Sequence, residues 1–237
     1  SSSVFFLSPS LIRTGIPFIT VVSWFNRHYM KIIFLLFLLL SAIHIEAQTG
    51  SEIYLFNLAF NNNQPVLSNP VNITNRKGYD NQPFFHPHKP VIYYSSFNDS
   101  GRSDIQYYHI KKARTAHLTF TNEREYSPTL TPDGKFISCI IQRDDGSQDL
   151  GKYPLKGGEP RILINTLKVG YHLWVDDHSL LLFVLGDSNK NTLHLYNLLT
   201  KEDNIIADNP GRSLHRIPGT NTISFVHKIS KEEWLIK

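Results

Sequence analysis

The chain has 237 residues, a formal net charge of +4 and one cysteine, Cys139. A single cysteine cannot form an internal disulfide, which excludes a small disulfide-stapled scaffold and predicts a sizeable hydrophobic core. The sequence has no block of basic residues, and Arg143 lies beside two aspartates, so the positive charge does not predict nucleic-acid binding.

The first part of the chain reads as a targeting segment. Met30 is the only methionine, and Lys31 precedes nine apolar residues at positions 32–40. A positive start, a short apolar core and a small-residue exit at Ala47 are typical of a secretory signal peptide. We therefore predict a signal peptide over residues 30–47. The apolar core is too short for a membrane-spanning helix, which needs about 20 residues.

Two further assignments follow from this signal. Residues 48–237 are the predicted exported domain, without stable membrane insertion after cleavage and with a net charge reduced to +2. Residues 1–29 begin with serine and are interpreted as non-native sequence upstream of the true start. The alternative is a membrane anchor at residues 16–25, against which Pro17 and the short length argue.

Similar segments recur along the exported region. Three of them open 45 residues apart, at Asn81, Tyr126 and Tyr171. Each combines an aromatic stretch, a tight turn, an apolar run, further loops and short strand-like pieces. A repeat of about 40–45 residues with four strand-sized pieces is typical of a β-propeller blade. We therefore predict an all-β fold: a β-propeller of four-stranded antiparallel blades, three of them whole and two partial.

The repeat begins with a half copy. Residues 51–57 align with 103–109, and residues 69–74 align with 114–119. In the first whole copy we expect strands at residues 90–96, 104–109 and 115–119.

The middle copy has the clearest turn chemistry. Ser127 and Pro128 open its first strand, and the residues Pro132, Asp133 and Gly134 form a turn. Proline presets φ, aspartate bonds its own backbone, and glycine accepts conformations that other residues avoid. The expected strands that follow cover residues 136–141, 148–153 and 161–165. The first of these is apolar on both faces, as suits a strand between neighbouring sheets, and places Cys139 in the core.

Later copies are less regular. The third has expected strands at residues 171–175, 180–185 and 192–196. A fourth begins near Ser213, has its second strand at 222–226, and stops inside the expected third strand. The half copy and this unfinished copy could together make a fourth blade; a truncated larger propeller is the favoured interpretation.

Residues 126–137 resemble the Ser-Pro-Asp-Gly repeat of TolB-like β-propellers, a WD-like repeat family, with weaker matches at residues 82–94, 171–183 and 213–226. Only the middle copy keeps Pro132, Asp133 and Gly134 intact. The resemblance implies a periplasmic propeller that acts as a protein-interaction platform, and this chain is interpreted as a truncated member.

The functional expectation is an exported, non-catalytic scaffold, periplasmic or secreted, that binds an envelope protein or a glycan. No nucleophile elbow, phosphate loop or zinc-protease motif is present, and no cofactor is predicted. The alternative is part of an enzyme, for which the resemblance offers two forms. One is a metal-dependent oligosaccharide lyase, and the other is the gating domain of a prolyl-oligopeptidase-like peptidase.

His86 and His88 are the candidate metal ligands. Two histidines at i and i+2 can share one face of a strand, but a metal site needs further ligands. Both align with the turn that Pro132 and Asp133 occupy in the next copy, which favours a role for both histidines as turn residues over a role as metal ligands. The lyase interpretation requires His86 or His88 to converge with His172 or His215.

Overall fold

The computed structural model describes residues 50–237. The described residues belong to one compact unit of the chain. The predicted signal peptide and the upstream segment lie outside the described residues, so these assignments stay predictions.

Strands dominate the described part of the chain. Between residues 50 and 237 the structure has two short 3-10 turns, Ile110–Lys112 and Asp187–Asn189, and no α-helix. It accordingly has no helix, over those residues, that is long and apolar enough to cross a membrane. The strands are β1 (Tyr54–Asn61), β2 (Gln64–Asn72), β3 (Asp80–Phe85), β4 (Val91–Phe97), β5 (Ser103–His109), β6 (Arg114–His117), β7 (Arg124–Leu130), β8 (Phe136–Gln142), β9 (Gln148–Pro154), β10 (Arg161–Ile164), β11 (Val169–Trp174), β12 (Ser179–Val184), β13 (Thr192–Asn197), β14 (Asp203–Asp208), β15 (Pro210–Arg216), β16 (Ile223–Lys228) and β17 (Trp234–Ile236).

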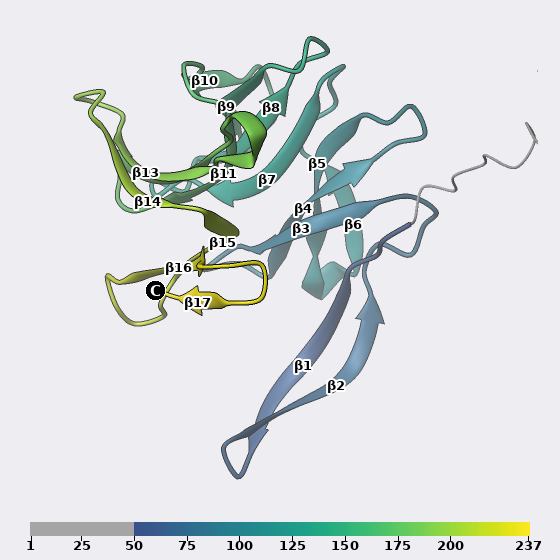
Figure 1. Cartoon of the computed structure of the whole chain (residues 1–237). Helices are drawn as coiled ribbons and strands as arrows, with labels where there is room; N and C mark the ends of the chain where they lie inside the picture. Colours follow the sequence, from purple (N-terminus) through teal and green to yellow (C-terminus); the bar gives the residue numbers. More distant parts are fainter. Residues whose placement is uncertain (1–49) are drawn as a thin grey trace, which may run out of the picture. The chain divides into compact units, whose positions relative to one another are not determined.

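These strands form antiparallel meanders in chain order (Figure 1). Blade 1 is β3–β6, blade 2 is β7–β10 and blade 3 is β11–β14, each with four consecutive antiparallel strands. A hairpin of β1 and β2 precedes them, and the three-stranded sheet β15–β17 follows. The predicted fold class, with three whole blades and two partial ones, is confirmed.

The second strand of each blade forms the centre of the core. In β8, all residues from Ile137 to Ile141 are buried, including Cys139. Strands β4 and β12 are buried in the same way along nearly their whole length. Consecutive side chains point to opposite faces, so a strand buried on both faces must lie between two other layers. The apolar run of residues 136–141 predicted this burial correctly.

The half copy is joined to blade 1 as blade 1 is joined to blade 2. A single parallel bridge links Ser51 to Tyr79, and its counterpart links Ser103 to Arg124. The Ser51 hydroxyl donates to the Asp80 carbonyl oxygen (2.8 Å), and the Ser103 hydroxyl donates to that of Glu125 (3.0 Å). The predicted alignment of residues 51–57 with 103–109 therefore holds in three dimensions.

Two details differ from the sequence prediction. Strand β14 closes blade 3 at Asp203–Asp208, where no strand was assigned, because its polar residues carry little strand signal. The hairpin β1–β2 and the sheet β15–β17 are separate sheets, so the two partial copies do not share one four-stranded blade.

The β1–β2 hairpin exposes much of its apolar surface. Ile53 and Ile73 at its base are buried with Tyr94 and Tyr108 of blade 1. Beyond the base, Leu58 is 60% exposed and Phe60 is 70% exposed. These side chains alternate along β1, so one face of the hairpin is apolar and uncovered.

Candidate binding site at the inner strands

The first strands of the three blades and of the sheet β15–β17, which we call the inner strands, line one cavity. Its volume is about 600 Å³, and we call it the inner-strand cavity. It is bounded by residues 82–84 of β3, 127–129 of β7, 171–173 of β11 and 211–216 of β15, with Val226 and Trp234. A cavity shared by several structural elements is the usual place for a ligand site.

A bulge shapes each of the first two inner strands. Gln82 and Ser127, 45 residues apart, both have a positive φ of 54°. The strand pairing shifts register at these positions. The Gln82 side-chain oxygen accepts a hydrogen bond from the Ser127 N–H (2.7 Å) and another from the Ser95 hydroxyl (3.2 Å). The bulges are therefore coupled, and one side chain holds neighbouring inner strands together.

The turns that follow the inner strands line an adjoining cavity of about 940 Å³. This turn-side cavity is bounded by residues 84–89, 129–134 and 173–176, with Arg216 and Pro218. It shares the side chains of Phe84, Thr129, Leu173 and Arg216 with the inner-strand cavity.

The predicted repeat motif is divided between the two cavities. Ser127 and Pro128 line the inner-strand cavity, whereas Pro132, Asp133 and Gly134 line the turn-side cavity.

Local hydrogen bonds fix the turn at Asp133. The Asp133 carboxylate accepts bonds from the Lys135 N–H (3.0 Å) and from the Thr131 hydroxyl (2.6 Å). Gly134 has a φ of +66°, and its N–H donates to the Thr131 carbonyl oxygen (2.9 Å). The motif therefore builds a rigid rim for the cavity, with aspartate and glycine in their expected turn roles.

His86 and His88 also lie at the turn-side cavity. His86 is buried, and its Nδ1 accepts a hydrogen bond from the backbone N–H of His88 (3.1 Å). Burial, with nearby Lys89 and His88, lowers the pKa of His86 and favours neutral imidazole. Across residues 50–237, no three His, Cys, Asp or Glu side chains are placed to hold a metal ion.

His172 is the most buried histidine at the inner-strand cavity. Its Nε2 lies 2.7 Å from the Ser138 hydroxyl, which also accepts a bond from the indole N–H of Trp174 (2.8 Å). Burial lowers the pKa of His172 to about 3, so the ring is neutral at physiological pH. Its Nδ1 has no hydrogen-bond partner within the described part of the chain. The sequence indicated His172 only as a possible metal ligand, although its spacing of 45 residues from Ser127 places it at the same position of the repeat.

Arginine residues of β15 give the inner-strand cavity its positive charge. Arg212 and Arg216 line it together with His215, and among residues 50–237 no aspartate or glutamate does. The Arg216 guanidinium donates to the carbonyl oxygens of Trp174 (3.2 Å) and Val175 (2.5 Å), which fixes this cation against blade 3. The cavity therefore suits an electron-rich ligand.

Comparison with known proteins gives a likeness of fold. No family model matches the chain, and no curated protein matches it. The solved structure of TolB from Acinetobacter baumannii is similar with a TM-score of 0.57 and 16% identity, over 77% of this chain and 48% of that one. The chain has a TolB-like β-propeller fold.

Two more structures support this TolB-like fold. A candidate TolB from Agrobacterium tumefaciens matches with a TM-score of 0.54 and 15% identity, over 69% of this chain and 58% of that one. A nidogen/laminin complex contains a chain that matches with a TM-score of 0.57 and 13% identity, over 75% and 70%. The TolB-like chain thus spans about half the length of the two TolB proteins.

Proposed function

We propose that this chain is an exported, non-catalytic binding module of the bacterial cell envelope, periplasmic or secreted. Its partner is an envelope protein, of which an electron-rich segment enters the inner-strand cavity. The observation that carries the proposal is the joint lining of one cavity by four inner strands, with Arg212, His215 and Arg216 on one wall.

Two features support binding over catalysis. Two polar side chains of the cavity are hydrogen-bonded into the fold, Gln82 to the Ser127 N–H and His172 through Nε2 to Ser138. The Ser138 hydroxyl is buried and engaged by Trp174, so it is not free to attack a substrate. The nidogen/laminin complex, a protein–protein complex with a chain of similar fold, is consistent with a protein partner.

The test is a capture experiment from envelope extract with matched variants. Arg212→Glu reverses a cavity charge, whereas Lys156→Glu makes the same charge change on an exposed loop residue outside the cavity. We expect proteins recovered by the native chain and by Lys156→Glu to be lost with Arg212→Glu. Equal recovery with both variants, or nothing specific with the native chain, contradicts the proposal.

Metal analysis separates this function from the lyase alternative. The lyase needs a bound metal, for which His86, His88, His172 and His215 were the candidate ligands. Purified protein dialysed against Mn²⁺, Zn²⁺ or Ca²⁺ is expected to retain less than one equivalent. A stoichiometric ion that is lost on His172→Ala would instead favour the enzyme.

A further inference from the structure

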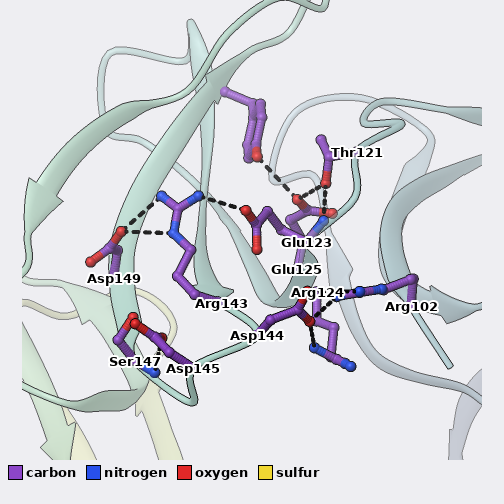
Figure 2. Close-up of polar contacts among 11 residues, drawn as sticks. Arg102, Thr121, Glu123, Arg124, Glu125, Arg143, Asp144, Asp145, Ser147 and Asp149 are labelled. Carbon is purple, nitrogen blue, oxygen red and sulfur yellow. Dashed lines mark hydrogen bonds and ion pairs between the residues drawn. The ribbon is translucent and has the colours of Figure 1, made fainter.

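A buried carboxyl group lies at the junction between blades 1 and 2. Glu125 of β7 is 0% exposed. Its Oε1 accepts a bond from the Thr121 hydroxyl (2.6 Å; Figure 2). The same oxygen accepts a bond from the Tyr153 hydroxyl (3.0 Å), and Oε2 lies 3.3 Å from Thr119 Oγ1. The ion pairs found among residues 50–237 do not include Glu125. Its hydrogen-bond partners among these residues are therefore all hydroxyl groups.

At the preceding junction, between the half copy and blade 1, the buried carboxylate forms an ion pair. Asp80 occupies the position of Glu125, 45 residues earlier, and its carboxylate accepts a bond from the Arg76 guanidinium (2.7 Å). Thr121 stands 45 residues after Arg76, so the second junction has a neutral hydroxyl where the first has a cation. An unpaired buried carboxylate is costly, and a buried carboxyl group avoids that cost by keeping its proton.

The groups that face Glu125 add no positive charge. They are Asp104 of β5, Cys139 of β8 and Tyr153 of β9. Burial raises the pKa of the Cys139 thiol and of the Tyr153 phenol, so neither ionises near neutrality. Burial also raises the pKa of Asp104, against the hydrogen bond from the Thr121 N–H. The net result is that burial raises the pKa of Glu125 to about 7, against the hydrogen bonds of Thr121 and Tyr153.

The same acid anchors the segment that connects the two blades. Residues 118–123 run from the end of β6 to β7, and they contact Glu125 through Thr119 and Thr121. The Thr121 N–H also donates to Asp104 (3.0 Å). Just beyond, Glu123 pairs with Arg143, and Arg124 pairs with Asp144 (Figure 2). Glu125 is therefore hydrogen-bonded to the segment that leads into these surface ion pairs.

We propose that Glu125 is a proton-dependent latch, which holds residues 118–123 against blade 2 when it is protonated and releases them when it is ionised. In the closed state the carboxyl O–H donates to Thr119 Oγ1, which has a second lone pair besides the one that accepts the Ile105 N–H. On ionisation this O–H donor is lost, and the carboxylate is a buried charge without an ion-pair partner. Local opening then hydrates the carboxylate and leaves the blades folded.

Hydrogen exchange of the full chain, followed by mass spectrometry, tests the latch. The pKa of Glu125 is near 7 in the closed state and near 4.5 in the open state. The opening equilibrium therefore shifts toward the open state as the pH rises between these two values. After correction for intrinsic rates, we expect the opening constant of residues 118–123 to rise at least tenfold from pH 5 to pH 7. The segment 73–78, beside the Asp80–Arg76 pair, is the internal control and does not show this rise.

Two variants separate the effect of Glu125 from that of Asp104, because neither variant changes Asp104. Glu125→Gln removes the ionisable group and is expected to abolish the rise. Thr121→Arg supplies the cation found at Arg76, leaves Glu125 in place and is also expected to abolish it. A flat profile in the native chain, or a rise that persists in Glu125→Gln, overturns the proposal. If Glu125→Gln fails to fold, persistence of the rise in Thr121→Arg overturns it.

Discussion

At the scale of single residues, His172 links stability to acidity. Its pKa is about 3 in the folded chain, far below the usual 6.5, because burial disfavours the charged ring. The unfolded chain binds a proton on this histidine below pH 6.5, whereas the folded chain does not. Stability from neutral His172 is therefore complete above pH 6.5 and falls as the pH decreases toward 3.

We expect His172→Gln to remove this acid sensitivity. The native chain should lose about 2 kcal/mol more than the variant between pH 6.5 and 5, since one pKa unit corresponds to about 1.4 kcal/mol. Denaturant unfolding at the two pH values measures the difference. His178→Gln, at an exposed position, is the control and should behave as the native chain. Parallel losses in the native chain and His172→Gln would show that His172 is not the source.

Asp133 has a local role that substitution can measure. Replacing it with alanine removes the acceptor for the Lys135 N–H and the Thr131 hydroxyl, and should lower the free energy of unfolding by about 1–2 kcal/mol. Asp133→Asn keeps an acceptor and should lose less than half as much in the same denaturant titration. Equal losses for the two variants would contradict the turn role.

At the scale of elements, strand positions were largely predictable. The strand expected at residues 136–141 is Phe136–Gln142, and that expected at 148–153 is Gln148–Pro154. These strands were predictable because alternation, β-branched residues and turn signals are local properties. The site depends on longer-range contacts: Ser138 meets His172 34 residues away, and Gln82 meets Ser127 45 residues away. A single sequence carries no direct signal for such pairs, so the cavity and the Glu125 junction became visible only in the structure.

The uncovered face of the β1–β2 hairpin predicts self-association. Leu58→Lys with Phe60→Lys removes exposed apolar surface and should increase the monomer fraction in concentration-dependent light scattering. The free energy of unfolding should change by no more than about 0.5 kcal/mol, because both side chains are largely exposed. The control is Asn61→Lys, which adds charge to the same hairpin without removing apolar surface. A loss of stability in the double variant would mean that this face is covered in solution.

At the scale of the whole molecule, Cys139 is a probe of unfolding. It is the only thiol in the chain, it is fully buried in β8, and burial raises its pKa well above the usual value. A thiol reagent should therefore label the native protein only as fast as blade 2 opens, and the rate should increase with denaturant. Mass spectrometry after timed labelling measures this rate. Rapid stoichiometric labelling in the absence of denaturant would contradict the burial.

The junction between blades 1 and 2 has a mechanical consequence. Within a blade, neighbouring strands such as β8 and β9 are paired along seven residues, whereas one backbone bridge joins Ser103 to Arg124 across the junction. Each blade is therefore a rigid unit, and side-chain contacts set its angle to the next blade. Under mechanical force, the blades should separate from one another before any single blade unfolds. A ligand in the inner-strand cavity, which is lined by the first strands of the three blades and of the sheet β15–β17, would resist their separation.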